Sequence, residues 1–205
     1  MIDGHRHEKG DTAMDCCGHE GHGSGDARFE IKKVADRVHA AVAAPAYKVN
    51  SNTAIIEIDD GVIIVDTHSK PSAARVIVER LRDLTPKPVR YVVNTHFHWD
   101  HWHGNEVYPA AYPGAEIVTN QITREAMLKK GLKRIGDHVR QVPKDIAKLE
   151  ADLAAARSAE ERTRLESDLR LARSYLTEVS GLKPALPTLV FEQTMRLYRR
   201  DRDLV

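Results

Sequence analysis

Residues 95–105 read Thr-His-Phe-His-Trp-Asp-His-Trp-His-Gly-Asn and directly follow an apolar, β-type run, Val89–Val93. This stretch contains the pattern His-x-His-x-Asp-His, which places four potential metal ligands within six residues. Side chains two apart on an extended strand end point the same way, so His96 and His98 can reach one cation. The pattern therefore predicts a metal site at the end of a strand.

Asp100 and His101 follow where the chain must turn, so these adjacent side chains can diverge toward a second cation. Neutral imidazole and carboxylate suit zinc, and iron or manganese less decisively. Two metal ions close together can share a water molecule and lower its pKa enough to give hydroxide near neutral pH. Gly104, which closes the motif, permits a close backbone approach or a positive φ. The alternative, a solvated histidine-rich loop, explains this ligand spacing less well.

The motif from His96 to His101 resembles the signature of the metallo-β-lactamase superfamily. The resemblance implies that His96 and His98 bind one metal ion, and that Asp100 and His101 bind a second. It also implies Zn²⁺ as the cofactor, two ions per complete domain, with iron as the alternative.

The chain upstream of the motif agrees with this resemblance. Residues 52–58 and 61–67 predict a β-hairpin that turns at Asp59-Asp60-Gly61. Asp66, at the end of the second strand, resembles the family's aspartate beneath the metal site, a carboxylate that orients the ligand loop without binding the ion. The alternative is that Asp66 is a turn or N-cap residue before the next helix.

The resemblance implies an α/β fold, a four-layer αβ/βα sandwich made of two similar halves. It covers about residues 29–205, which correspond to the N-terminal half and the start of the second half. The family draws three more ligands, a third histidine, a bridging aspartate and a final histidine, from a downstream segment that would follow Val205, so they have no match. Neither His68 nor His138 fits an expected position. We therefore expect a C-terminally truncated fragment of a metallo-β-lactamase-like domain. The competing interpretation is a short protein that completes its site by dimerisation or with its N-terminal tail.

Further strands and helices follow from periodicity. Alternation predicts paired strands over 29–34 and 38–42, where His39 lies among apolar neighbours and is expected to be structural. Helical spacing predicts one helix from 69–72 to 84 and another over 122–132, which ends near Gly131. Strands are expected over 89–95 and 115–119, and a further pair over 188–192 and 195–198.

Residues 142–180 depart from this pattern. Apolar residues step by 4 and 3 in two runs, separated by Ser158-Ala159-Glu160-Glu161, which has the form of a capping box. The segment is therefore predicted to be an inserted antiparallel helical hairpin with almost entirely charged outer faces. A packed structural arm is the favoured interpretation. A lid, or an arm through which a homodimer forms, is the functional alternative.

Composition limits the class of protein. The 205 residues suffice for one domain, and 31 basic against 30 acidic residues give no basic footprint for nucleic acid. No apolar run of about 18 residues predicts a membrane span. The N-terminus lacks the apolar segment of a signal peptide, which leaves a cytoplasmic location as the expectation.

Residues 1–28 are rich in Gly, His, Asp and Glu, and we expect them to form a disordered tail. The tail holds the adjacent Cys16 and Cys17, which make a poor structural disulfide, together with His19 and His22. Cys-Cys-x-His-x-x-His could bind a metal ion, but a solvated tail with incidental affinity is favoured.

The leading functional hypothesis is a zinc-dependent hydrolase, in which metal-bound hydroxide attacks a small-molecule ester, thioester or amide-type substrate. Asp100 is the expected catalytic residue, which orients the attacking water or takes its proton. Trp99 and Trp102 either line the pocket or pack in the core. The alternatives are a mononuclear iron oxygenase that acts on sulfur, and a metal-binding protein that is not an enzyme. The unmatched downstream ligands leave open whether this chain is active by itself.

Overall fold

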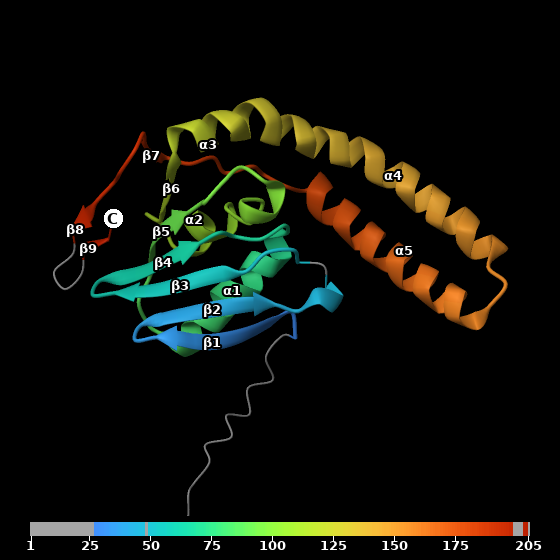
Figure 1. Cartoon of the computed structure of the whole chain (residues 1–205), viewed down its shortest axis with the longest axis horizontal. Coiled ribbons are helices and arrows are strands. Elements are labelled where there is room, and N and C mark those ends of the chain that lie inside the picture. The colour runs from blue at the N-terminus through green and yellow to red at the C-terminus, as the bar shows by residue number, and fades with distance from the viewer. Residues whose placement is uncertain (1–26, 48, 199–202, 205) are drawn as a thin grey trace, which may run out of the picture.

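The structure, a computed structural model, describes residues 27–47, 49–198 and 203–204 (Figure 1). Seven strands form one sheet in the order β1-β2-β3-β4-β5-β6-β7, and β8 pairs with β9 in a separate ladder. The strands are β1 (Phe29–Ala35), β2 (Val38–Ala43), β3 (Thr53–Ile58), β4 (Gly61–Val65), β5 (Val89–Val93), β6 (Glu116–Asn120), β7 (Leu189–Phe191), β8 (Leu197–Tyr198) and β9 (Asp203–Leu204).

The first four strands run antiparallel to their neighbours, and β4 to β7 are parallel. A mixed sheet with crossover helices confirms the predicted α/β class. The helices are α1 (Pro71–Leu84), α2 (Val107–Ala111), α3 (Gln121–Ala126), α4 (Leu132–Ala155) and α5 (Ala159–Ser180), with short 3₁₀ turns at Pro45–Tyr47 and Trp99–His101.

Helix α1 carries the chain from β4 to β5 and covers one face of the sheet (Figure 1). It begins with Pro71 in the first turn and ends before Pro86, since proline suits a helix start and interrupts a helix interior. Its buried face includes Val76, Ile77 and Leu81, which belong to the same core cluster as apolar side chains of β3, β4 and β5. Burial of each such side chain contributes about 1.5–3 kcal/mol, so this face holds the helix on the sheet.

The carboxyl ends of the parallel strands meet at one edge of the sheet. Asp66 follows β4, Thr95 and the His-x-His-x-Asp-His motif follow β5, and Asn120 ends β6. The fold therefore gathers polar side chains that are far apart in the sequence.

The predicted helix end near Gly131 is wrong. Helix α3 continues through a π-helical turn, Met127–Gly131, directly into α4, so the hairpin helices begin at Leu132 and not at residue 142. Gly131 has helical φ and ψ, and a Cβ atom there would lie 2.7 Å from the Trp102 ring. The glycine is explained by this close approach of helix and indole rather than by a helix stop.

Helices α4 and α5 lie antiparallel and project from the sheet as an arm (Figure 1). We call them the helical arm. They pack through an apolar seam that includes the buried Val142, Leu165, Leu169 and Val179. The Ser158 hydroxyl accepts a hydrogen bond from Glu161 N at 3.1 Å, as the capping box predicts. The Glu161 carboxylate accepts from Arg157 N rather than from Ser158 N, so only half of the predicted box forms.

The predicted pairing of residues 188–192 with 195–198 is also wrong. Strand β7 instead adds to the parallel sheet beside β6, with Val118 opposite Leu189, and β8 pairs with β9. Alternating apolar residues identify a strand but do not specify its partner. The partner here is set by the arm, which returns the chain to the β6 edge.

A buried imidazole lies beneath the loops at this sheet edge. His68 is fully buried with a φ of 69°, a rare conformation for a residue with a Cβ atom. Its Nδ1 lies 3.0 Å from the Ser51 carbonyl oxygen, and its Nε2 lies 2.8 Å from the Thr53 hydroxyl. The Thr53 hydroxyl donates to the Asp66 carbonyl (2.7 Å), and the Ser51 hydroxyl donates to the Asp100 carbonyl (2.5 Å). This network joins the start of β3 to the loops after β4 and β5.

We predict that Gly104→Ala destabilises the fold by about 3 kcal/mol. The new Cβ atom would lie 2.1 Å from the Thr67 carbonyl oxygen and 2.6 Å from Ala74 Cβ. The Thr67 backbone cannot easily move away, because its N–H donates to the His101 carbonyl. Urea unfolding measures the effect. Gly136→Ala is the control: it meets only the flexible Arg140 side chain in a helix and should leave stability unchanged or raised by up to about 1 kcal/mol. Equal effects of the two substitutions would contradict the packing argument.

Burial lowers the pKa of His68 to about 4, below its ordinary value near 6.5. The unfolded chain therefore binds more protons between pH 6.5 and pH 4, so acid should destabilise the fold in that window. We predict that this histidine accounts for about 3 kcal/mol of lost unfolding free energy between pH 7 and pH 4. Urea unfolding at both pH values should show a smaller loss for His68→Leu than for the wild type. An equal loss in both proteins would show that His68 does not carry the effect.

Candidate metal centre

The first two predicted ligands face each other beyond the end of β5. His96 Nε2 and His98 Nδ1 lie 3.1 Å apart, and the two rings meet edge to face with centroids separated by 4.8 Å. This is the arrangement expected for residues two apart on extended backbone. Both imidazoles thus direct a nitrogen to one place.

Asp100 and His101 form a second pair in the 3₁₀ turn that follows. Asp100 Oδ2 lies 3.5 Å from His101 Nε2. The ring of His101 also lies against that of His96, with centroids 3.9 Å apart. The structure therefore brings all four predicted ligand residues together as two adjoining pairs.

Asp66 supports this loop from below. Its carboxylate accepts hydrogen bonds from Thr95 N (2.9 Å), from the Thr95 hydroxyl (2.8 Å) and from His101 Nδ1 (2.7 Å). With the proton on Nδ1, Nε2 of His101 is the nitrogen that can bind a metal ion, and it lies on the side of Asp100. The N-cap of α1 is Lys70, so the alternative placement of Asp66 as a helix cap is not what the structure shows.

The pKa values of His96 and His101 shift in opposite directions. Burial lowers the pKa of His96, and the adjacent His101 and His98 lower it further. Burial also acts to lower the pKa of His101, but the hydrogen bond and charge of Asp66, with Asp100, outweigh it and raise the pKa. The pKa of His101 is raised and that of His96 is lowered, because only His101 forms a hydrogen bond with Asp66.

The spacing of both pairs suits zinc. An ion with bonds of about 2.0–2.1 Å and tetrahedral angles separates two ligand atoms by about 3.3 Å. The observed separations of 3.1 Å and 3.5 Å lie on either side of this value. Among the described residues, however, no group of three or more His, Cys, Asp or Glu side chains is arranged to hold one ion. The described part of the chain thus brings the four side chains together as two pairs, without a third ligand beside either pair.

The other histidines considered above lie elsewhere. His68 is in the buried network, and His138 Nδ1 lies 2.6 Å from the Tyr175 hydroxyl in the helical arm. His39 is on β2, opposite Lys33 and Ile55 in the sheet.

A buried amide pair beneath the motif was not predicted from the sequence. Asn94 and Asn105 exchange side-chain hydrogen bonds of 3.0 Å and 2.8 Å, and Asn94 also donates to the His101 carbonyl at 3.0 Å. Asn105 further accepts from the Thr67 hydroxyl (2.9 Å) and donates to the Ala185 carbonyl (3.0 Å). The sequence signal for this pair was an asparagine at each end of the motif, because a buried side-chain amide needs hydrogen-bond partners.

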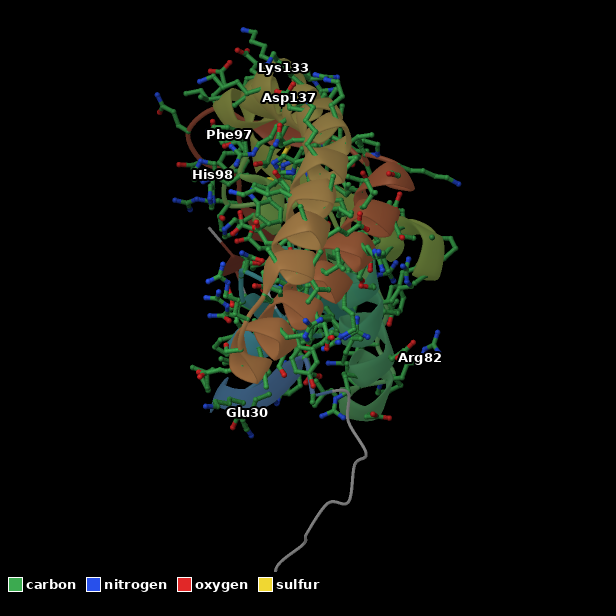
Figure 2. The ribbon with its side chains drawn as sticks, turned by 90° about the vertical axis from the view of Figure 1, so that its right-hand side faces the viewer. Glu30, Arg82, Phe97, His98, Lys133 and Asp137 are labelled. Atoms are coloured by element: carbon green, nitrogen blue, oxygen red, sulfur yellow. The ribbon has the colours of Figure 1, made fainter. Side chains whose placement is uncertain are left out.

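The two tryptophans of the motif have different roles. Trp102 is buried, and its indole N–H donates to the Phe97 carbonyl at 2.9 Å. Trp99 is half-buried and lies against the helical arm, with ring centroids 5.8 Å from His138 and 5.9 Å from Tyr175. Figure 2 shows Phe97 and His98 near the end of α4 that carries Lys133 and Asp137.

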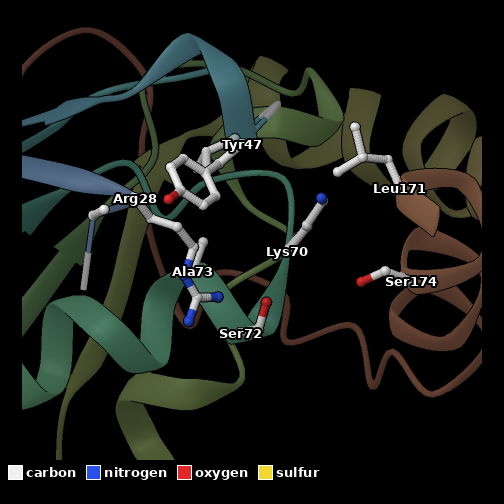
Figure 3. A pocket seen from close by; sticks show the side chains of 9 residues that line it. Arg28, Tyr47, Lys70, Ser72, Ala73, Leu171 and Ser174 are labelled. Atoms are coloured by element: carbon white, nitrogen blue, oxygen red, sulfur yellow. The ribbon is translucent and has the colours of Figure 1, made fainter. Parts of the chain in front are cut away.

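Two cavities separate the helical arm from the sheet domain. One, of about 410 Å³, is lined by Trp99, by three polar residues and by apolar side chains of both arm helices: Asn50, Lys70, Asp168, Leu149, Leu171, Ala172 and Tyr175. The other, of about 470 Å³, shares Lys70 and Leu171 with the first. It is more polar, and Figure 3 shows the side chains of Arg28, Lys70 and Ser174 around it. Trp99 is the link between the first cavity and the metal motif.

In the described part of the chain, no helix has the length and apolar character needed to cross a membrane.

Comparison with known proteins agrees with the geometry. The family model described as "Metallo-beta-lactamase superfamily" matches residues 46–171. A linear primary-alkylsulfatase from Pseudomonas sp. (strain ATCC 19151) is 37% identical over 54 residues, which are 26% of this chain and 10% of the relative.

Similar solved structures include a metallo-beta-lactamase from Pontibacter korlensis (21% identity, TM-score 0.45, 50% of this chain and 48% of that chain). Another is from Hirschia baltica (25%, 0.43, 50% and 48%), and a third is FIM-1 from Pseudomonas aeruginosa in its mono-zinc form (24%, 0.45, 52% and 48%). The chain spans about half the length of these structures and a tenth of the alkylsulfatase. Because the family model covers more than half of its residues, the chain belongs to the metallo-β-lactamase superfamily.

Proposed function

We propose that this protein is a zinc-dependent hydrolase of small-molecule esters, thioesters or amide-type substrates. The observation that carries the proposal is the presence of two ligand pairs, 3.1 Å and 3.5 Å apart, at the carboxyl end of β5. The superfamily generally consists of hydrolytic enzymes that bind zinc, which supports the same assignment.

In this proposal His96 and His98 hold one ion, and Asp100 and His101 hold the other. Asp66 keeps the His101 ring in one tautomer, and Thr95 in turn fixes the Asp66 carboxylate through two hydrogen bonds. The described residues thus position ligands through contacts that do not themselves involve the metal.

Bound zinc would act as a Lewis acid on the substrate oxygen and lower the pKa of a water molecule. Asp100 is 20% exposed at its side chain, so its carboxylate is accessible from solvent. We infer that it orients the attacking water and accepts its proton, while the leaving group departs from the substrate carbonyl carbon.

Sulfate esters belong in the substrate panel as a second candidate. The local similarity to a linear primary-alkylsulfatase is the specific observation that favours them. Nitrophenyl esters, a thioester and a linear alkyl sulfate, assayed side by side with added Zn²⁺, would rank these classes. No zinc-dependent hydrolysis of any member would overturn the proposed function.

We predict that His98→Ala lowers zinc content and abolishes hydrolysis, because it removes one nitrogen of the first pair. Zinc is measured by elemental analysis after dialysis, and hydrolysis by product release. His39→Ala is the matched control, since this histidine lies on β2 away from the motif. Unchanged activity in His98→Ala would refute the assignment of the site.

A second prediction concerns the support of His101. Asp66→Asn replaces the carboxylate that accepts its Nδ1 proton with a weaker amide acceptor. We expect zinc affinity to fall about 10- to 100-fold, measured by competition with a chelator. Affinity equal to that of the wild type would show that the hydrogen bond does not tune the ligand.

The alternatives predict other results in the same measurements. Bound iron, with turnover only in the presence of oxygen, would favour the sulfur oxygenase. A chain that lacks residues 1–28 tests the metal-binding alternative: loss of most bound metal with this segment would show that the motif is not the main site.

A further inference from the structure

We propose that the cavity between Trp99 and the helical arm binds an apolar chain of the substrate, a linear alkyl or acyl group. This inference rests on the proposed function, because it assumes that the reacting bond lies at the metal motif. It assigns to the arm a role in substrate selection.

The walls of the cavity come from three parts of the fold. Trp99 lies between the predicted ligands His98 and Asp100 in the chain and forms the wall nearest the motif. Leu149 of α4 and Leu171 and Ala172 of α5 face it from the arm. A volume of about 410 Å³ is within the range of about 300–1,000 Å³ usual for small-molecule sites. An apolar wall that begins at a ligand loop suits the non-reacting part of a substrate.

Polar and aromatic contacts attach the base of the arm to the domain beside this cavity. The Glu178 carboxylate accepts a hydrogen bond from Ser72 N at 3.1 Å and so fixes α5 to the first turn of α1. His138 of α4 is bound to the Tyr175 hydroxyl, and both rings lie against Trp99. The arm therefore meets the domain through specific polar and aromatic contacts, which leave the space between them unfilled.

The surroundings of the cavity limit the length of the chain it can hold. Lys70 and Asp168 are part of its lining, and Lys70 also lines the neighbouring cavity. There Arg28 and the Ser174 hydroxyl add polar groups, as Figure 3 shows. A chain that outgrows the first cavity would meet charged side chains rather than more apolar surface. We therefore expect affinity to rise with chain length and then to level off.

The test measures binding of straight-chain alcohols, which carry no charge to attract them to the metal ligands. Tryptophan fluorescence of the full chain is titrated with 1-butanol, 1-hexanol and 1-octanol. Each added methylene should strengthen binding about fourfold until the cavity is filled. Ala172→Phe should weaken octanol binding at least tenfold, because the ring occupies the cavity.

Ala154→Phe is the matched control, since Ala154 is exposed on α4 of the same arm and does not line the cavity. It should bind octanol like the wild type. If circular dichroism shows that Ala172→Phe does not fold, Leu149→Gln replaces it, because this substitution makes the cavity polar. It should weaken octanol binding by the same order of magnitude. Alcohol binding that does not depend on chain length would overturn the proposal. A folded Ala172→Phe variant that binds octanol like the wild type would also overturn it. Concentration-dependent dimers that Ala172→Phe disrupts would also overturn it and assign this face to a second copy of the chain.

Hydrolysis separates this inference from the proposed function. Nitrophenyl butyrate and nitrophenyl octanoate are compared in the zinc-loaded protein. Ala172→Phe should raise KM for the octanoate more than for the butyrate, whereas Ala154→Phe should hydrolyse both like the wild type. Zinc-dependent hydrolysis without a length preference would refute the inference and leave the function intact. Octanol binding without any hydrolysis would support the cavity and refute the function.

Discussion

The carboxylate of Asp66 is the contact on which the candidate site depends. Asp66 directly follows β4, yet its three hydrogen-bond donors all belong to the segment after β5: Thr95 N, the Thr95 hydroxyl and His101 Nδ1. The Asp66 side chain is only 9% exposed, so its oxygens are largely shielded from competing water. The parallel pairing of β4 with β5 brings the two strand ends together. The hydrogen bonds of Asp66 then fix the orientation of the loop over residues 95–101.

The helical arm also contacts the candidate site, although it lies far from Asp66 in the sequence. It is inserted between β6 and β7, and its return allows β7 to extend the parallel sheet. Its base contacts the metal motif through Trp99, while Glu178 contacts the start of α1. An arm that only stabilised the fold would not need to touch the ligand loop. Contact at this place makes the arm a candidate wall of the substrate site, and its charged outer faces explain why it can project into solvent.

The sequence predicted best where one physical signal dominates. Alternation and short apolar runs placed β1 to β6, and the spacing of the motif identified four side chains that the structure brings together. It failed where a contact from elsewhere decides the outcome. Gly131 resembles a helix stop, but the approach of Trp102 explains it. The His68 network could not be predicted, because Ser51, Thr53 and His68 meet only after β3 and β4 have paired.

The loop that follows β5, residues 95–101, is held by hydrogen bonds to other parts of the protein. Backbone carbonyls of Asp100 and His101 accept hydrogen bonds from Ser51 and Asn94, and the carbonyl of Asp66 accepts one from Thr53. Because these bonds already fix the backbone, binding of an ion would lose little conformational entropy in the loop. In the proposed site, where the described residues would supply two ligands to each ion, this preorganisation would matter most. Where fewer bonds to the metal are available, each must be made by a side chain that is already in place.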